Sequence, residues 1–497
     1  MNSFILALDQ GTTGTTAALI DALNYTLVDK INHEFPQIFP TPGQVEHDLN
    51  DIWSSVEKAV TELLKKNKVD GSQINCIGIT NQRETTCAFD KKGHPLANAI
   101  VWQDRRTQDF CQSLKSQESQ IRKKTGLPID PYFSGTKMRW LLNNNQKVQT
   151  AATENDLRLG TIDTFLLYKL TSGTSFKTEP SNASRTLLMD LETFQWDQQL
   201  LQTFGMQKHF LPEINDSFSL FGKTKNLNFL PDGIPITGIL GDQQAALFGQ
   251  GALAPGEMKC TYGTGAFMLI NLGEKLRSSE HGLLSTAYYA HQGKKHYALE
   301  GSCYIAGAAV QWLRDNIKIV ESSSESEQLA SQVENLAEME HLLFLPFFSG
   351  IASPYWVSDA KAAIIGMTRD TSGKHLTRAC LDGVALSIND LISSMKQDTG
   401  LEIKSLNVDG GMCANNLFCQ IQANFSKINI VRPKIIETTA YGAALAAAIG
   451  NGNLKISKVK DFWKKDKEFT PENSDVDYYN KKINQWEKTI KQLYFAK

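Results

Sequence analysis

A strand–turn–strand pattern rich in glycine and threonine occurs twice in this chain and constrains its fold more than any other feature. Residues 4–8 form an apolar strand that ends in the turn Asp9-Gln-Gly-Thr-Thr-Gly-Thr-Thr16, after which residues 17–20 form a second strand. Lys259-Cys-Thr-Tyr-Gly-Thr-Gly265 similarly precedes the apolar strand 266–270. Because the second copy begins just after the midpoint, the repeat predicts two related halves that face each other.

The length of the chain also favours two domains, because 497 residues are too many for one ordinary hydrophobic core. We place an N-terminal domain at residues 1–250 and a C-terminal domain at residues 251–497, with residues 453–497 as a lysine-rich terminal surface segment. The net charge is −2 and long basic runs are lacking, which argues against nucleic acid or a membrane surface as a partner. No apolar run is long enough to span a bilayer.

The N-terminus and the cysteines indicate a cytoplasmic protein. Residues 1–9 lack the basic region of a signal peptide and are typical of a first strand. The eight cysteines are scattered and form no Cys-x-x-Cys pair, so we expect neither a zinc site nor a disulfide framework. Such cysteine usage is typical of a reducing compartment.

Both glycine-containing turns lead into a strand, whereas a P-loop or a dinucleotide fingerprint leads into a helix. Backbone N–H groups at tight turns form nests that bind phosphate oxygens. Two facing nests, one at Thr12 and Thr13 and one at Thr264, would hold a polyphosphate between the halves. Asp9 can hold Mg²⁺ through water, because Mg²⁺ keeps much of its hydration shell. The alternative is a pair of ordinary hairpins.

Asp242 lies at a predicted junction between a strand and a helix. Residues 234–240 are an apolar run typical of a buried strand, and residues 245–248 are typical of a helix start. Ligands of open α/β sheets bind at the carboxyl ends of strands. Asp242 can therefore act as a base that takes a proton from an attacking hydroxyl. It can equally be a helix N-cap, and this stretch alone leaves both interpretations open.

Arg83 and Glu84 follow another predicted strand and can converge on one ligand if they lie in a loop. Arg donates and Glu accepts hydrogen bonds, which suits the hydroxyls of a polyol. The alternative is a surface ion pair of little energetic value. Tyr132 lies in a loop bounded by Gly and Pro, so its hydroxyl can reach a ligand. Trp102 and Phe267 are candidates for an apolar wall, or for ordinary core residues.

Further elements follow from periodicity and glycine placement. Apolar spacing predicts helices at residues 51–64 and 376–395, and an alanine-rich helix at residues 438–449 that is small enough for close packing. Residues 86–89 are predicted to pair with the strand before them. The two glycines of Asp409-Gly-Gly411 permit close approach of the backbone to a planar ring or ribose, or form a structural turn.

Taken together and in order, these motifs resemble the FGGY carbohydrate kinase family, and within it the members that phosphorylate glycerol. The resemblance extends to about residue 450, and Tyr132 to Asn144 fits the first family signature. Arg83, Glu84 and Tyr132 separate this branch from kinases of sugars such as xylulose. The matching motifs are Asp9-Gln-Gly-Thr-Thr13, Thr80-Asn-Gln-Arg-Glu-Thr85, Val101-Trp-Gln-Asp-Arg-Arg-Thr107, Asp130-Pro-Tyr-Phe-Ser-Gly-Thr-Lys137, Gly241-Asp-Gln-Gln-Ala-Ala-Leu-Phe-Gly-Gln250, Thr261-Tyr-Gly-Thr-Gly265, Gln311-Trp-Leu-Arg-Asp315 and Asp409-Gly-Gly411.

The resemblance implies an α/β fold of two actin-like, ribonuclease H-like domains with the active site in the interdomain cleft. It implies ATP-dependent phosphorylation of glycerol to sn-glycerol 3-phosphate with Mg²⁺, in the cytoplasm. We also expect a homo-oligomer, either a dimer or a tetramer.

The resemblance also assigns roles by matching position. Asp242 would be the general base and Asp9 the Mg²⁺ partner. The substrate would contact Arg83, Glu84, Trp102, Tyr132, Asp242, Gln243 and Phe267. The nucleotide would contact Thr12, Thr13, Gly14, Thr264, Gly307, Gln311, Gly411 and Asn415.

Two alternative functions remain open at this point. A related FGGY kinase would act on another polyol or on a pentulose. An actin-like nucleotide switch without a metabolic substrate would keep both phosphate nests, but it would have no need of Arg83, Glu84, Tyr132 and Asp242 together.

The chain departs from the family pattern at three places. Thr16 stands where the family often has an Arg that contacts phosphate. The loop after Trp356 reads Val-Ser-Asp-Ala-Lys361, where the family usually has Asp-Pro and an Arg. Cys380 occupies an unusual position in the second family signature.

Regulation by fructose 1,6-bisphosphate is predicted to be weak or absent. Some bacterial members of this branch bind the bisphosphate through a Gly-x-Arg loop, and the corresponding Pro231-Asp-Gly233 lacks the Arg. Without a guanidinium, the loop loses the bidentate donor that suits a phosphate. Titration of the bisphosphate into a glycerol phosphorylation assay tests this prediction, and clear inhibition at physiological concentrations would contradict it.

Overall fold

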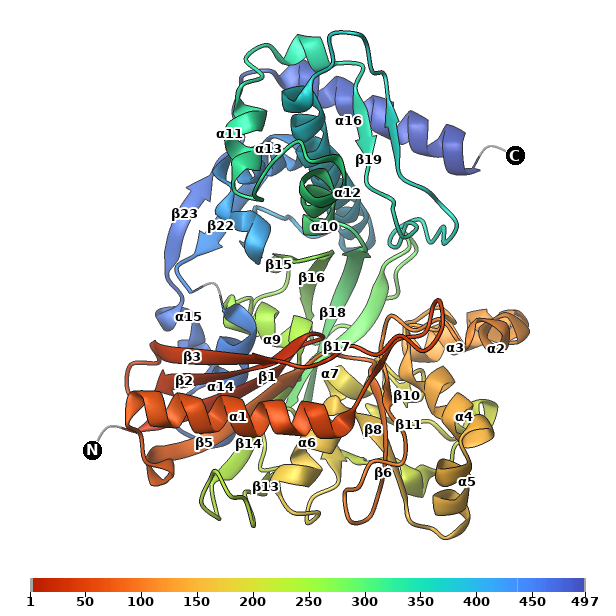
Figure 1. The fold of residues 1–497 in the computed structure, drawn as a ribbon, viewed down its shortest axis with the longest axis vertical. Coiled ribbons are helices and arrows are strands. Elements are labelled where there is room, and N and C mark those ends of the chain that lie inside the picture. The colour runs from red at the N-terminus through yellow and green to blue at the C-terminus, as the bar shows by residue number, and fades with distance from the viewer. Residues whose placement is uncertain (1–2, 436, 496–497) are drawn as a thin grey trace.

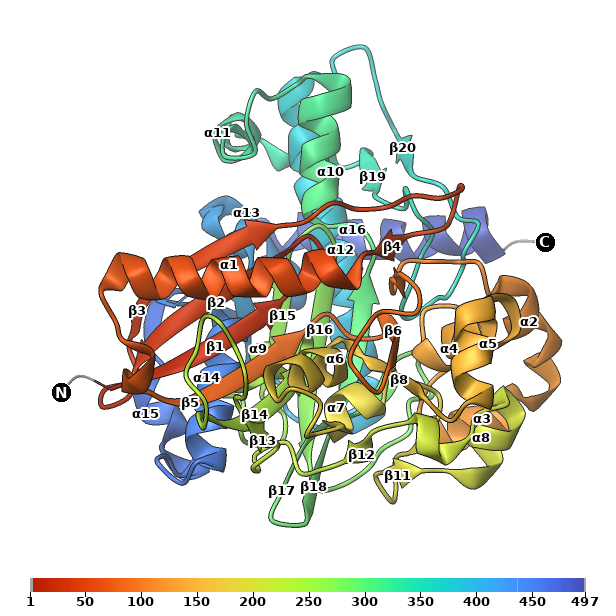
Figure 2. The ribbon, with the colours of Figure 1, turned by 60° about the horizontal axis from the view of Figure 1, so that its bottom comes forward.

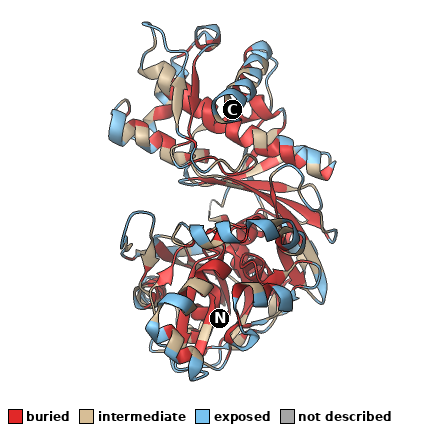
Figure 3. Ribbon diagram, turned by 90° about the vertical axis from the view of Figure 1, so that its right-hand side faces the viewer, coloured by how far each residue is buried: buried red, intermediate tan, exposed pale blue. Residues whose placement is uncertain are grey.

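The computed structural model describes residues 3–435 and 437–495. Figure 1 shows two lobes. The first half of the chain, coloured red to yellow, forms one lobe, and most of the second half, coloured green to blue, forms the other. Buried residues concentrate in the sheets and inner helix faces of both lobes (Figure 3). Among the described residues, no helix is long and apolar enough to cross a membrane.

The first lobe is built on a six-stranded sheet. β1 and β2 form the predicted antiparallel hairpin, β2 pairs antiparallel with β3, and β5 and β14 extend the sheet parallel to β1. In spatial order, the strands are β13 (Gly222–Lys223), β14 (Pro235–Gly241), β5 (Ile74–Asn81), β1 (Phe4–Gln10), β2 (Gly14–Asp21) and β3 (Leu27–Glu34).

The second lobe repeats this arrangement in a seven-stranded sheet. β15 and β16 form a hairpin, β16 pairs antiparallel with β18, and β21 and β22 extend the sheet parallel to β15. In spatial order, the strands are β17 (Leu284–His291), β18 (Lys294–Cys303), β16 (Ala266–Gly273), β15 (Met258–Tyr262), β21 (Ser405–Asp409), β22 (Asn429–Pro433) and β23 (Lys465–Phe469).

The order β18-β16-β15-β21-β22 therefore matches β3-β2-β1-β5-β14 in both sequence and direction. This duplicated five-stranded order is that of the ribonuclease H-like, actin-like fold. It confirms the predicted fold class and the prediction that the chain consists of two related halves.

Helices cover both faces of the first sheet. Helix α1 (Leu49–Asn67) packs on β2 and β3, as Figure 2 shows. Alternate residues of β1 divide between the two faces: Leu6 and Leu8 belong to the core under α1, whereas Ile5 and Ala7 face the core that contains the alanine-rich helix α14.

Helix α14 (Thr438–Gly450) belongs to the second half of the chain but packs on the sheet of the first lobe. Glycines permit its close approach. A Cβ on Gly78 would lie 2.1 Å from a carbonyl oxygen of α14. A Cβ on Gly442 would lie 1.9 Å from the carbonyl oxygen of Ala245 in helix α9 (Asp242–Gly249). The helix that follows the cleft residue Asp242 is thus fixed by a helix from the other half.

The predicted pairing of residues 86–89 with the preceding strand is wrong. β6 (Thr86–Asp90) instead pairs with β7 (Ala99–Ile100) and β8 (Leu157–Thr161) in a separate sheet. Glu84 adopts a left-handed conformation with φ of 62°, which turns the chain away from β5.

The predicted surface segment at residues 453–497 is described as far as residue 495, and that part is more deeply packed than predicted. Its strand β23 adds to the second sheet, antiparallel to β22. Its helix α16 (Val476–Ile490) buries Tyr478 and Trp486 in the core of the second lobe. Even Lys482 of this helix is buried, and its Nζ donates to the carbonyl oxygens of Met339 and Leu342. Composition alone concealed the apolar side of this amphipathic helix.

Candidate active site

The turn between β1 and β2 forms the first predicted phosphate nest. The backbone N–H of Gly11 donates to the carbonyl oxygen of Gly14 at 2.9 Å, which closes the turn. Thr12 is half-buried and Thr13 is exposed, so both can meet a ligand. Gly14 is buried, and a Cβ there would lie 2.9 Å from the carbonyl oxygen of His33. Gly14 therefore serves the packing of β2 on β3, and a nucleotide contact there stays a prediction.

A cavity of about 440 Å³ lies beside the second turn, between the β15–β16 hairpin, helix α10 (Gly307–Trp312) and the loop after β21. It is large enough for a base and a ribose. Five of the eight predicted nucleotide contacts line it, namely Thr264, Gly307, Gln311, Gly411 and Asn415. Sequence reasoning missed several of its other lining residues, namely Tyr262, Ser323, Ser326, Glu327 and Met412.

Glycines bring the walls of this cavity together. A Cβ on Gly307 would lie 2.6 Å from the carbonyl oxygen of Gly263. Gly410 has a φ of 90°, and a Cβ there would lie 2.4 Å from the carbonyl oxygen of Tyr262. The cavity thus depends on backbone contacts that a larger residue would prevent.

An aromatic wall lies next to the first phosphate nest. The ring of Trp102 is 5.7 Å from that of Tyr132 and 6.3 Å from that of Phe267, both edge to face. The indole N–H of Trp102 donates to the hydroxyl of Thr12 at 3.0 Å. The structure therefore brings these three predicted substrate residues together, across both lobes and against the phosphate turn.

A buried group of charges lies at the same place. Arg83 Nε is 3.1 Å from Oδ1 of Asp242, and its two Nη atoms donate to Glu300 at 2.5 and 2.9 Å. Glu84 accepts a hydrogen bond from Nε of Arg185 at 2.5 Å. Burial raises the pKa of Glu300, but the guanidiniums of Arg185 and Arg83 outweigh it and lower that pKa to about 2. Sequence reasoning missed Glu300 and Arg185.

Asp242 is the first residue of α9 rather than its N-cap, which is Gly241. Its side chain is 29% exposed, so one side of the carboxylate faces the open site. Oδ1 accepts from the backbone N–H of Gln243 at 2.7 Å, and Oδ2 accepts from the side-chain amide of Gln243 at 3.2 Å. The carboxylate is therefore held in place, and its role as a base stays a prediction.

Gln243 accepts a hydrogen bond from a buried lysine, Lys259, that the sequence did not reveal as part of the site. Lys259 of β15 donates from Nζ to Oε1 of Gln243 and, at 2.8 Å, to the hydroxyl of Thr261. Burial lowers the pKa of Lys259, whereas the nearby Asp409 and Asp242 carboxylates oppose that change. In the sequence, only its position in the strand that leads into the second nest could have indicated a role for Lys259.

Asp9 fits a divalent cation. Burial raises the pKa of Asp9, and the neighbouring Asp242 and Glu437 carboxylates add to the effect, so that the pKa is about 8. A cation would remove this repulsion, and Mg²⁺ is commonly held by one or two carboxylates together with phosphate oxygens and water. Within residues 3–435 and 437–495, no cluster of three or more metal-ligating side chains provides a complete protein site.

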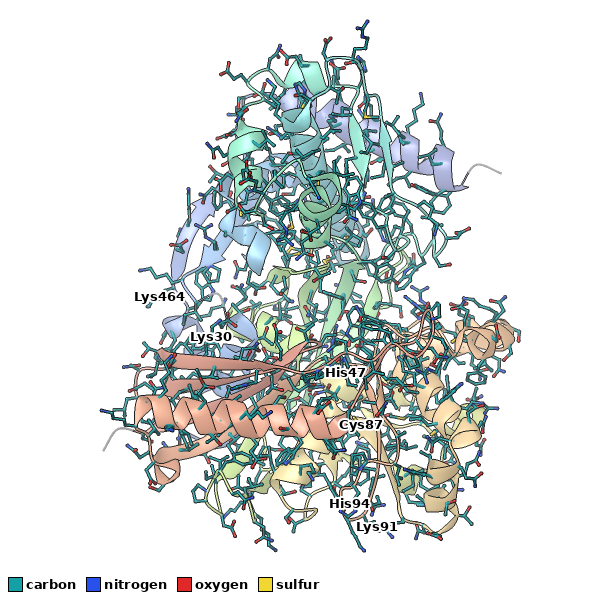
Figure 4. The ribbon with its side chains drawn as sticks, in the orientation of Figure 1. Lys30, His47, Cys87, Lys91, His94 and Lys464 are labelled. Atoms are coloured by element: carbon teal, nitrogen blue, oxygen red, sulfur yellow. The ribbon has the colours of Figure 1, made fainter. Side chains whose placement is uncertain are left out.

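His47 is linked to the first nest through the side chain of Gln37. It is fully buried, and its ring packs edge-on against Phe35 at 5.0 Å. Its Nε2 donates to Gln37 at 2.6 Å, and Gln37 donates to the carbonyl oxygen of Thr12 at 3.1 Å. Figure 4 shows His47 beside the end of α1, near the junction of the lobes. The side chain of Gln37 thus binds a carbonyl oxygen of the turn and does not compete with a ligand for the N–H groups of the turn.

The duplicated sheets, the nucleotide-sized cavity between glycine-rich turns and the adjoining polar pocket define a two-domain protein of the actin-like ATPase class. Residues 4–249 match the N-terminal domain, and residues 258–450 the C-terminal domain, of the FGGY family of carbohydrate kinases. The chain belongs to this family.

Curated relatives cover nearly the whole chain. It is 48% identical over 474 residues to a glycerol kinase of Bdellovibrio bacteriovorus, which covers 94% of this chain and 95% of the relative. It is 44% identical over 495 residues to a glycerol kinase of Staphylococcus epidermidis, covering 99% and 98%.

Solved structures extend the comparison. The crystal structure of a Plasmodium falciparum glycerol kinase with ADP aligns with a TM-score of 0.91 at 36% identity, covering 100% of this chain and 99% of that one. A gluconate kinase of Lactobacillus acidophilus aligns with a TM-score of 0.88 at 23% identity over 100% and 99% of the chains, and therefore shows the shared fold.

The buried state of His47 predicts a specific pH dependence of stability. Burial lowers the pKa of His47 to about 4, whereas an unfolded histidine titrates near pH 6.5. Below pH 6.5 the unfolded chain binds the extra proton, so this residue costs stability as the pH falls toward 4. Relative to His47→Gln, the wild type should lose about 1.4 kcal/mol per pH unit between roughly pH 6 and 4.5.

Urea unfolding of both proteins at a series of pH values measures this difference. The exposed His341, for which the described residues offer no ion pair, provides the control, and His341→Gln should follow the wild type in parallel. If the stability difference between wild type and His47→Gln does not change with pH, then His47 is not buried in its neutral form.

Proposed function

We propose that this protein transfers the γ-phosphoryl group of ATP to a terminal hydroxyl of glycerol, giving sn-glycerol 3-phosphate. The observation that carries this proposal is the contact of Trp102 with both Tyr132 and the phosphate turn at Thr12. It implies that a small ligand on the aromatic wall lies next to the γ-phosphate. The named activity of the relatives supports the same conclusion.

The polar residues of the pocket suit a polyol. Arg83 would donate to a ligand hydroxyl and Glu84 would accept from one, while the Tyr132 hydroxyl and Gln243 would complete the hydrogen bonds. Trp102 and Phe267 would contact the carbon chain, whose CH groups bind apolar surface. The roles of these residues are part of the proposal.

Asp242 would act as the general base. Oδ1 accepts from the backbone N–H of Gln243 at 2.7 Å and lies 3.1 Å from Nε of Arg83, whereas Oδ2 has one longer bond from the Gln243 amide at 3.2 Å. Oδ2 is therefore the oxygen that would accept the proton of the attacking hydroxyl. The oxygen of that hydroxyl forms a bond to the γ-phosphorus as the bond to ADP breaks. Because phosphoryl transfer proceeds through a loose transition state, much of the effect of Asp242 would be to orient the hydroxyl.

The nucleotide would lie with its base and ribose in the 440 Å³ cavity and its phosphates between the two turns. Thr12, Thr13 and Thr264 would bind the phosphates, and Asp9 would hold Mg²⁺ through water. Bound Mg²⁺ neutralises charge on the phosphates during such transfers. Gly14 would contribute through the shape of its turn.

Location and assembly complete the proposal. We place the protein in the cytoplasm because all eight of its cysteines are free thiols, as expected in a reducing compartment. A homo-oligomer of two or four copies stays a prediction, as does the division of roles between residues 1–250 and 251–497.

A coupled assay for ADP release across glycerol, dihydroxyacetone, erythritol and xylulose tests the function. We expect glycerol to give the highest kcat/KM, because the charged and aromatic residues enclose a short polyol. A preference for xylulose or erythritol would favour a related kinase of the family. ADP release that does not depend on any polyol would favour a nucleotide switch.

Substitution of the base provides a second test. Asp242→Asn should lower kcat by about 10²–10⁴-fold, because it keeps the shape of the side chain but removes the proton acceptor. ADP affinity, measured by calorimetry, should stay unchanged, because Asp242 does not line the nucleotide cavity. Asp109 is an exposed carboxylate in the first turn of another helix, so Asp109→Asn is the matched control. Turnover of Asp242→Asn near that of the control would remove Asp242 as the base.

A further inference from the structure

We infer that Arg185 and Glu300 are positioning residues that hold Arg83 and Glu84 in the geometry that binds the polyol. The inference rests on the proposed function, because it assigns these two residues to the substrate pocket of that reaction. The four side chains are defined here as the charge quartet.

Charges alternate through the quartet. The two Nη atoms of Arg83 donate to the two carboxylate oxygens of Glu300 at 2.5 and 2.9 Å. Arg185 donates from Nη2 to Glu300 at 3.2 Å and from Nε to Glu84 at 2.5 Å. Each carboxylate thus contacts a guanidinium, and Glu300 joins both arginines.

The quartet is buried, and only its two proposed ligand-binding members have any exposed surface. Arg83 is 3% exposed, Glu84 is 2% exposed, and Arg185 and Glu300 are fully buried. Burying an ion costs several kcal/mol, and its pairing in the interior often only compensates for that cost. Stability alone therefore gives little reason for four buried charges, whereas a fixed geometry gives a clear one.

The contacts leave defined atoms for a ligand. Glu300 binds both Nη atoms of Arg83 from one side, so that Nε points toward Asp242. Arg185 binds Oε1 of Glu84, so Oε2 is the oxygen left to accept from a ligand hydroxyl. Arg185 also lies over the ring of Tyr132 at 5.5 Å. Arg185 and Glu300 therefore contact three of the predicted substrate residues, Arg83, Glu84 and Tyr132.

Other contacts hold the stem of Arg83 and the backbone of Glu84, so that only the charged ends of the two side chains remain to be positioned. A Cβ on Gly241 would lie 2.6 Å from Cδ of Arg83, so the arginine stem packs directly on the strand end. The carbonyl oxygen of Glu84 accepts from the hydroxyl of Ser134 at 2.9 Å. With the backbone and stem held in this way, the quartet decides where the charged ends lie.

The quartet also connects the two sheets. Arg83 and Glu84 follow β5 of the first sheet, whereas Glu300 lies in β18 of the second. A residue of the second sheet thus fixes a binding group that the first sheet supplies.

The test compares steady-state constants for Glu300→Gln and Arg185→Lys. Glu300→Gln keeps the shape of the side chain but loses the charge that holds Arg83. Arg185→Lys keeps the number of positive and negative charges but loses the hydrogen bond from Nε to Glu84. We expect both to raise the KM for glycerol by about 10–100-fold, because displacing a positioning group by an ångström has effects of that size. The KM for ATP should change little, because neither Arg185 nor Glu300 lines the proposed nucleotide cavity.

A matched control separates positioning from loss of a buried ion pair. Arg378 is also buried, and its Nε donates to Asp382 at 2.9 Å within helix α12 (Gly373–Thr399). Arg378→Lys should lower the melting temperature as Arg185→Lys does, yet leave the KM for glycerol unchanged. The double variant Arg185→Gln/Glu300→Gln keeps the remaining charges balanced and serves if the single Glu300→Gln variant fails to fold.

The outcomes separate the inference from the function. If the wild type does not phosphorylate glycerol, the proposed function fails. If it does, and the folded quartet variants keep a normal KM for glycerol, the positioning role is overturned. An equal rise in the KM values of glycerol and ATP, like that of a general loss of structure, also overturns it. A selective rise for glycerol in the quartet variants but not in Arg378→Lys supports it.

Discussion

The buried ion pair between Arg83 and Glu300 joins the two sheets of this protein at the base of the candidate active site. Because Glu300 takes both Nη atoms, Nε of Arg83 faces Asp242. Asp242 in turn follows β14 and begins α9, whose middle and last residues are held against α14 by glycine contacts at Gly442 and Gly249. The position of the proposed base therefore depends on residues from both halves of the chain. A duplicated fold achieves this because its two hairpin turns face one cleft.

Much of the fold and part of the site follow from local sequence. The Gly-Thr turns after Asp9 and Lys259 predict two hairpins, and the structure repeats the whole strand order around them. The junction at Asp242 and the glycines around residue 410 are also local signals. Arg185 and Glu300 carry no such signal, because their partners lie 101 and 217 residues away in the sequence. Charged residues of this kind are usually exposed, and only the tertiary structure shows that they are paired and buried.

The incorrect predictions have the same cause. Residues 86–89 do form a strand, but the left-handed backbone of Glu84 directs it to another sheet. That conformation also turns the Glu84 side chain toward Arg185, so the feature that misled the pairing prediction belongs to the site. The C-terminal segment is rich in lysine, yet Trp486 and Tyr478 anchor it to the second lobe. In both places a few tertiary contacts outweigh the local pattern.

The cavity proposed for the nucleotide is shaped mainly by backbone contacts, whereas the pocket proposed for the polyol is shaped by side chains. This difference affects how such a fold acquires its substrate specificity. The nucleotide cavity is shaped by backbone contacts at Gly307 and Gly410, so many side-chain changes around it would preserve ATP binding. The pocket proposed to bind the polyol is shaped by charged and aromatic side chains, and its two buried charged residues depend on Arg185 and Glu300. A change of substrate would therefore require coordinated replacement of Arg83, Glu84 and the residues that hold them. Replacing Arg83 or Glu84 alone would leave the buried charge of its partner unpaired, which costs more than the lost contact.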